Sequence, residues 1–270
     1  MLGIVTVVLL ASVLIGFCSG FVYTQSSGAK VELQDPAGPV RPENANPVPT
    51  AAPSAGPTTT KLEILSVEAL GRKVAPSVWR VTTMDEAGKP VEVSAMVAGS
   101  FGGQTFMLTS FSAVRAATNS PGPEIIVRNG GSQTTATLWT WQEDRDLALL
   151  VVPRPAPPLP WVGDERAPKA GDKVFVASEG TDLVQGKITS ISSTGIEHDI
   201  PVDGLRQGGA LINDRGEVLG MASSEYNPGG VGTDRIFIAI PIRNACEQVL
   251  SCSSGNPSEP EATPPTTARR

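Results

Sequence analysis

A series of short apolar runs, separated by turn residues, is the feature that most constrains how this chain of 270 residues can fold. From Lys61 onward the runs are rich in Val, Ile and Thr, and the residues between them are mainly Gly, Pro, Asp and Asn. Many short strands at this spacing are typical of an antiparallel β-sandwich or β-barrel. The runs are SVWRVTT, VEVSAMVAG, TFMLTS, EIIVRN, ATLWTW, LALLVV, KVFVAS, GKITSISS, ALIND, EVLGMAS and RIFIAI.

Two segments that flank these runs have the pattern of a helix. They are LEILSVEALGRKV before the first run and PIRNACEQVLS after the last. We therefore predict an all-β core with a C-terminal helix, in one folded domain over residues 61–252. Residues 25–60 and 253–270 are rich in Pro, Ala, Thr or Ser and poor in large apolar side chains, so we expect a disordered linker and a disordered tail.

The N-terminal segment, residues 1–24, is apolar and carries no charged side chain. A helix from Met1 to Tyr23 rises by roughly 34 Å, which is enough to cross the hydrocarbon layer of a bilayer. No Lys or Arg precedes the apolar run, and the run is longer than the apolar region of most signal peptides. We expect a retained transmembrane helix. A cleaved signal sequence and lipid attachment at Cys18, where IGFC resembles a bacterial lipobox, are the alternatives.

The cysteines bear on the cellular compartment. Cys246 and Cys252 are the two that lie outside the N-terminal segment, and both are at the end of the predicted terminal helix. A helix followed by a chain reversal could bring them within bridging distance, and a persistent disulfide implies an oxidising compartment. The alternative is two unpaired small hydrophobic side chains. With the anchor, the disulfide predicts a single-pass cell-membrane protein whose folded domain lies on the periplasmic or cell-wall side.

Composition excludes several kinds of ligand. The formal net charge is −6 and no run of Lys or Arg is present, which argues against a nucleic-acid partner. One His and no clustered Cys cannot make a zinc site, so no metal is predicted. The segment GTDLVQGK has the wrong glycine spacing for a phosphate-binding loop and no hydroxyl residue after Lys187. No cofactor is predicted.

The order of several motifs resembles the trypsin-like serine proteases, which have the chymotrypsin double-barrel fold. The motifs are AGSFGGQTFMLTSFSAV, DLALLVV, QGGALINDRGEVLGM and IFIAIPI, and the likeness extends over most of the chain from Val74 to Cys252. It is closest to the bacterial HtrA-type branch. The resemblance implies two antiparallel six-stranded β-barrels with a C-terminal helix, and it makes RPAPPLP part of the extended crossing between them, to which we assign no chemistry.

At the catalytic positions the chain departs from the family pattern. The resemblance places Ser112 at the general-base His, Asp146 at the Asp that orients this His, and Gln207 at the nucleophilic Ser. In the family the backbone N–H groups of that Ser and of a Gly two residues earlier form the oxyanion hole. Leu205 stands in the place of the Gly. The catalytic machinery is therefore predicted to be degenerate.

The chemistry of hydroxyl attack leads to the same prediction without alignment. A Ser nucleophile needs a neighbouring base near neutral pH, and in this fold the base is an imidazole that precedes the Asp in the chain. The one His of the chain is His198, which follows Asp146 and lies nine residues before Gln207. We expect it to point from a strand to solvent or to a local partner.

These observations predict a membrane-tethered pseudoprotease that binds a protein or peptide, for example as an accessory subunit of a membrane-protein complex. The cleft residues predicted to bind are Leu205, Gln207, Gly208 and Gly209. One alternative is that other surfaces, or the tether and anchor, bind the partner. Another is a hydrolase with an unconventional nucleophile, Ser110 or Ser112, assisted by a Lys.

Overall fold

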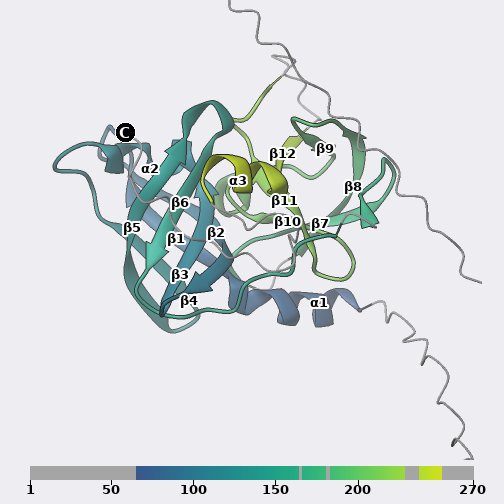
Figure 1. The fold of residues 1–270 in the computed structure, drawn as a ribbon, viewed down its shortest axis with the longest axis horizontal. Helices are drawn as coiled ribbons and strands as arrows, with labels where there is room; N and C mark the ends of the chain where they lie inside the picture. The colour runs from purple at the N-terminus through teal and green to yellow at the C-terminus, as the bar shows by residue number, and fades with distance from the viewer. Residues whose placement is uncertain (1–64, 164–165, 181–182, 229–236, 251–270) are drawn as a thin grey trace, which may run out of the picture. The chain divides into compact units, whose positions relative to one another are not determined.

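The computed structural model describes residues 65–163, 166–180, 183–228 and 237–250, which form two closed β-barrels (Figure 1). The predicted anchor over residues 1–24, the linker over 25–60 and the tail over 253–270 lie outside the described residues, as does Cys18. Among the helices that are described, none combines the length and the apolar character needed to cross a bilayer.

The first barrel has the strand order β1-β2-β3-β6-β5-β4, and each neighbouring pair is antiparallel. Pairing of β1 with β4, in which Arg80 is opposite Arg128, closes it. The strands are β1 (Val78–Met84), β2 (Pro90–Phe101), β3 (Gln104–Ser110), β4 (Ile125–Asn129), β5 (Ser132–Gln142) and β6 (Leu147–Val152).

The second barrel has the order β10-β11-β12-β9-β8-β7 and is closed by pairing of β7 with β10, where Ala177 is opposite Ala210. Its strands are β7 (Lys173–Ala177), β8 (Leu183–Ile191), β9 (Ile196–His198), β10 (Ala210–Ile212), β11 (Val218–Ser223) and β12 (Phe237–Pro241). The prediction of two six-stranded antiparallel barrels is thus confirmed.

Helices are few and short. Both predicted helical segments contain one, α1 (Val67–Val74) and α3 (Ile242–Gln248), and Ser66 caps α1 by accepting the Ala69 N–H at 3.2 Å. Cys246 on α3 is disulfide-bonded, but Cys252 lies outside the described residues, so the pairing of these two cysteines stays a prediction. The other helical elements are α2 (Phe111–Val114), η1 (Ala75–Ser77), η2 (Arg115–Thr118), η3 (Glu143–Arg145) and η5 (Gly204–Arg206).

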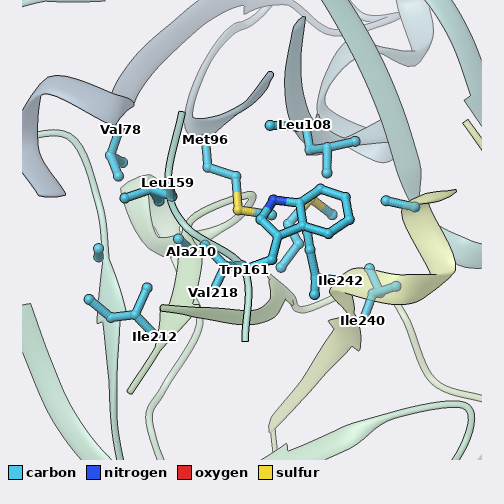
Figure 2. Close-up of a cluster of buried hydrophobic side chains, with 14 of the residues drawn as sticks. Val78, Met96, Leu108, Leu159, Trp161, Ala210, Ile212, Val218, Ile240 and Ile242 are labelled. Atoms are coloured by element: carbon cyan, nitrogen blue, oxygen red, sulfur yellow. The ribbon is translucent and has the colours of Figure 1, made fainter. Parts of the chain in front are cut away.

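The apolar core has three parts, one inside each barrel and one shared between them. The unbroken apolar run of β6 serves two of these parts, because side chains alternate across a strand. Leu149 packs in the cluster shared by both barrels, whereas Leu150 packs in the cluster inside the first barrel. Figure 2 shows the centre of the shared cluster, where the indole of Trp161 lies among side chains that include Met96 and Leu108 of the first barrel.

Candidate functional site

Asp146 is the centre of a buried polar network at the contact between the barrels. It follows η3, and among the described residues it is the one non-glycine residue with a positive φ, 49°. Asp tolerates this left-handed conformation better than most residues. Its carbonyl oxygen accepts the Phe111 N–H at 3.1 Å, which joins the start of β6 to the start of α2. The side chain is only 5% exposed.

Four donors surround the Asp146 carboxylate. Oδ1 accepts the backbone N–H of Ser112 at 2.7 Å. Oδ2 accepts the hydroxyls of Ser110 and Ser223, both at 2.6 Å, and the Nε2 of Gln207 at 3.1 Å. A buried carboxylate needs such donors in place of the water it loses. Three donors converge on Oδ2 and one is on Oδ1, so both oxygens of the carboxylate have partners without an imidazole.

Gln207 contributes its side chain to this network from the second barrel. It follows η5 and is 7% exposed. Its Nε2 donates to Ser110 Oγ at 2.6 Å as well as to Asp146, and its Oε1 accepts the Ser224 N–H at 2.6 Å. A flipped amide would place Oε1 against the carboxylate and Nε2 against a donor, so the network fixes the orientation of the amide. Gln207 thereby joins the two barrels.

The direction of the hydroxyl hydrogen bonds follows from counting protons. Ser110 has a single hydroxyl proton, which it donates to Asp146. In the contact of 2.7 Å between the hydroxyls of Ser110 and Ser112, Ser112 must therefore be the donor. Ser110 is fully buried, whereas Ser112 is half-buried and reaches the surface.

The structure thus brings Ser112, Asp146 and Gln207 together, where the resemblance places the catalytic triad. It also adds Ser223, which the sequence analysis did not single out. The signal for it was a polar residue at the end of the otherwise apolar run VLGMAS, which is buried along its whole length. A polar side chain that ends a buried strand needs a partner, and here the partner is Asp146.

The backbone around Gln207 does not present the two free N–H groups that the family uses for the oxyanion hole. The Gln207 N–H donates to the Gly204 carbonyl at 3.1 Å, within the turn formed by η5. The Leu205 carbonyl oxygen accepts the hydroxyl of Ser94 on β2 at 2.6 Å. At least one of the two donors is therefore already used inside the protein.

Gly208 and Gly209, two of the predicted cleft residues, are buried. Their N–H groups donate to Ala222 at 2.9 Å and to Arg206 at 3.0 Å. Gly208 has φ 74°, and a Cβ atom there would lie 2.2 Å from the carbonyl oxygen of Ser94. A glycine is therefore needed because this segment packs directly against β2, and these two residues offer no free donor to a ligand.

An open pocket of about 290 Å³ lies beside the network. Of the four predicted cleft residues, Gln207 lines it, and Leu205, Gly208 and Gly209 do not. The lining residues are Val91, Glu92, Val93, Ser112, Ala113, Gly204, Gln207, Ser224 and Glu225. Two glutamates and two serines therefore line the space where the resemblance places the substrate.

His198 is remote from this chemistry. It lies on β9 and is fully buried, so the expectation that it points to solvent is wrong. A local partner does exist, because Nδ1 accepts the Ile200 N–H at 3.2 Å, and the ring stacks on Phe237 with centroids 6.4 Å apart. Burial lowers the pKa of the imidazole to about 4, against the opposing effect of the Asp199 carboxylate. The ring is neutral at physiological pH and has no access to the pocket.

A polar contact also ties the barrels together beside the pocket. Arg80 on β1 donates to Glu179, which follows β7, from Nη2 at 2.8 Å and from Nε at 3.1 Å. The Glu179 N–H in turn donates to Ser94 Oγ at 3.1 Å. Both contacts join strands of the first barrel to the second. The wall of the pocket is therefore supported from both halves of the fold.

Comparison with known proteins agrees with this architecture. The trypsin-like peptidase domain family matches residues 93–221. Among curated proteins, none matches the chain. A serine endoprotease from Yersinia pestis is similar in structure, with 25% identity and a TM-score of 0.54 over 68% of this chain and 65% of that one. The HtrA-type protease AlgW, solved with a tripeptide, has 23% identity and a TM-score of 0.53 over 68% of this chain and 62% of its own.

The chain therefore spans slightly less than two thirds of the length of each of these two proteins. At 23% identity, the likeness to AlgW concerns the fold alone. In its fold, and over the residues that the family model matches, the chain is similar to the trypsin-like peptidases, and the solved structures it resembles include HtrA-type proteases.

Proposed function

We propose that the protein is a catalytically silent homologue of the HtrA-type proteases and that it acts by binding a protein or peptide. The observation that carries the proposal is the contact between the Gln207 amide and Asp146, at 3.1 Å. The amide donates to the carboxylate as a general-base imidazole does in an active triad, but it cannot accept a proton from a nucleophile near neutral pH. The Gln207 amide therefore takes the hydrogen-bonding position of the base but cannot act as a base.

No other group of the network replaces the missing base. The Asp146 carboxylate has four donors, and Ser110 gives its hydroxyl proton to that carboxylate. His198 is buried in the second barrel. Loss of triad members in serine proteases costs on the order of 10⁴ to 10⁶ in rate. We therefore expect no proteolysis at a useful rate.

Binding is supported by the pocket that remains. Both barrels are closed, so an extended peptide can pair only with segments beyond the strand ladders, such as the exposed residues Ser224 and Glu225 after β11. The N–H groups of both residues already donate to Gln207 Oε1 and to Ser223 Oγ, so a peptide that runs along this segment would bind through their carbonyl oxygens. Glu92 and Glu225 line the pocket. Glu92 is paired with Arg80 at 3.5 Å, so it is mainly the Glu225 carboxylate that favours a ligand with a basic side chain.

The cellular setting of the proposal comes from the sequence. The apolar segment over residues 1–24 and the Pro-rich linker over 25–60 would hold the domain near a membrane on its extracytoplasmic side. The expected partner is a protein or peptide there, for example part of a membrane-protein complex. Digestion of the protein in sealed cells or spheroplasts tests the orientation, because only a domain outside the cytoplasm is accessible to added protease.

The absence of catalysis is tested with the purified full chain and a fluorophosphonate probe, next to an active HtrA-type protease as a positive control. We expect no labelling and no turnover of peptide or ester substrates. Ser112 is the one serine of the network that both lines the pocket and joins the hydrogen-bond chain to Asp146. Labelling that is lost in Ser112→Ala would therefore favour the alternative, a hydrolase with an unconventional nucleophile.

Binding in the pocket is tested by charge reversal. Partners that co-purify from detergent-solubilised membranes are identified by mass spectrometry for the parent protein and for Glu225→Arg. The control is Glu86→Arg, an exposed residue of the turn between β1 and β2 that does not line the pocket. We expect recovery to fall for Glu225→Arg only. Equal recovery from all three proteins would show that the partner binds elsewhere.

A further inference from the structure

The crossing between the barrels, residues 153–160, contains five exposed prolines. Two of its residues, Ala156 and Leu159, are buried against the protein. Leu159 is part of the cluster shared by both barrels (Figure 2). The exposed residues between and around them are Pro153, Pro155, Pro157, Pro158 and Pro160. Neither the fold family nor the pocket accounts for this surface.

The sequence of the crossing restricts its backbone to an extended conformation. Each proline fixes its own φ near −65°, and the residue before a proline is driven to extended or polyproline II geometry. From Arg154 to Pro160, every residue is a proline or directly precedes one. A polyproline II helix has about three residues per turn. Ala156 and Leu159, three apart, therefore share the inward face, which agrees with their burial.

The outward faces of the same helix carry two columns of rings. One contains Pro155 and Pro158, and the other contains Pro157 and Pro160. Arg154 begins the second column, three residues before Pro157. Its guanidinium lies over the Trp79 ring at 5.3 Å from the centroid, which holds a positive charge at this end of the segment.

Hydrogen bonds hold several carbonyl oxygens of the crossing and leave three others free. The carbonyl oxygen of Pro160 accepts the Val218 N–H at 2.8 Å. The carbonyl oxygen of Ala156 accepts Ser100 Oγ at 2.8 Å, and that of Arg154 accepts Thr105 Oγ1 at 2.6 Å. The Leu159 N–H donates to Val97 at 3.2 Å. By contrast, no described residue donates to the carbonyl oxygens of Pro155, Pro157 or Pro158. The segment is therefore held in place while three outward acceptors remain available.

An exposed aromatic residue directly follows one that binds the crossing. Phe101, at the end of β2, is 59% exposed, more than any other large apolar side chain among the described residues. It directly follows Ser100, whose hydroxyl binds the Ala156 carbonyl. Position 101 is therefore one residue away from a hydrogen bond to the crossing.

We infer that the crossing is a preformed proline-rich ligand for a groove lined by Tyr and Trp side chains on a partner protein. Such grooves stack aromatic faces on proline rings, and their hydroxyl and indole N–H groups donate to the carbonyl oxygens of the ligand. Because the crossing is already fixed, little conformational entropy is lost on binding. The Arg154 charge favours an acidic residue at one end of the groove.

The chemistry of the crossing selects this occupant over two others. A second copy of the chain does not fit, because among the described residues the Trp and Tyr side chains are buried or half-buried and none forms an exposed aromatic groove. A lipid surface offers no fixed donors for the three carbonyl oxygens. The inference is independent of the pocket next to Gln207, since the two surfaces have no residue in common.

The test is site-specific photocrosslinking in native membranes with the full chain. The probe, p-benzoylphenylalanine, is placed at Phe101, where it replaces one exposed aromatic ring by another. Ile191, an exposed apolar residue on β8, receives the same probe as a control. Crosslinked peptides are sequenced by mass spectrometry, so that the contacted segment of the partner is identified and not only its presence.

The expected result is a crosslink from position 101 to a segment of another protein that carries Tyr or Trp residues in a groove. We expect it to fall at least about tenfold in Pro157→Ala/Pro158→Ala, which removes one ring from each column, and to persist in Pro90→Ala, an exposed proline of β2. A synthetic peptide of residues 152–161 should compete, and the same peptide with both alanines should not.

Three results would overturn the inference. They are crosslinks only to lipid or to a second copy of the chain, crosslinks no stronger than those from position 191, and crosslinks that neither the double variant nor the competing peptide reduces. The peptide experiment needs no folded variant, so it decides the matter even if the double variant is unstable. Glu225→Arg should leave this crosslink unchanged, which separates it from binding in the pocket.

Discussion

The contact between Gln207 and Asp146 predicts a specific effect of the substitution Gln207→Glu, which keeps the shape of the side chain and replaces its NH₂ by oxygen. The introduced oxygen would lie about 3.1 Å from the Asp146 carboxylate. Two unit charges at this distance repel each other by about 5 kcal/mol at an effective dielectric constant of about 20. Two carboxylates this close therefore share one proton.

The sign of the pH dependence follows from where that proton is held. The repulsion is equivalent to about 4 pKa units, so the pKa of the introduced carboxyl should rise from about 4.3 in the unfolded chain to about 8 in the folded one. Between these values the folded state binds more protons than the unfolded state, and the free energy of unfolding decreases as the pH rises. Near pH 4 the protonated carboxyl still donates one hydrogen bond to Asp146 but loses the second one, to Ser110.

We therefore expect Gln207→Glu to be destabilised by about 1 kcal/mol at pH 4 and by about 5 kcal/mol at pH 7. The assay is urea unfolding of the detergent-solubilised chain, followed by Trp fluorescence, with the parent protein measured at each pH. Gln185→Glu, on the exposed face of β8, is the matched control and should differ little from the parent at any pH. A destabilisation by Gln207→Glu that is the same at pH 4 and pH 7 would show that the residue 207 side chain does not face Asp146.

Two further predictions concern stability. Burial lowers the pKa of His198 to about 4 from 6.5, so the unfolded state binds the proton first and the chain should lose about 3 kcal/mol as the pH falls from 6.5 to 4. His198→Phe should remove this loss, and unfolding curves whose pH dependence is unchanged by the substitution would contradict it. Gly208→Ala should cost about 2–4 kcal/mol, because the added Cβ meets the Ser94 carbonyl oxygen and the backbone has a positive φ. Gly130→Ala also has a positive φ but open space around it, so it should cost only about 1 kcal/mol, and equal melting temperatures of the two variants would refute the role of the contact.

The strands and their arrangement could be read from the sequence because two independent signals agreed. The eleven apolar runs correspond to eleven of the twelve strands, all except the three-residue β9, and the order of the motifs predicted the two barrels. The unbroken burial of β6 also has a simple cause, since its alternate residues belong to different parts of the core. A run that is apolar on both faces is what such a strand requires.

The position of the candidate site was predictable, but its internal contacts were not. The motifs place Ser112, Asp146 and Gln207 by alignment alone. That the Gln207 amide reaches Asp146 depends on the approach of η5 to β2, where Ser94 N–H donates to the Gln207 carbonyl at 2.9 Å. Ser94 and Gln207 are more than a hundred positions apart in the sequence, so no local sequence pattern predicts that they come together.

The burial of His198 could have been predicted from the residues that precede it in the strand. In a strand, residues two apart face the same side. Ile196 and His198 are both buried on β9, whereas Glu197 between them is only half-buried. The apolar Ile196 therefore indicated an inward His198, even though the residue type is more often found near the surface.

The core shared between the barrels has a consequence for how the molecule comes apart. Met96, Leu108 and Trp161 belong to a cluster that both halves need to complete. A cut within the crossing that separated the halves would expose this cluster to water on each side, and neither fragment would keep enough buried surface to stay folded. The two barrels should accordingly unfold in one cooperative transition, and amide protons of β2 and β11 should exchange with solvent at the same denaturant concentration.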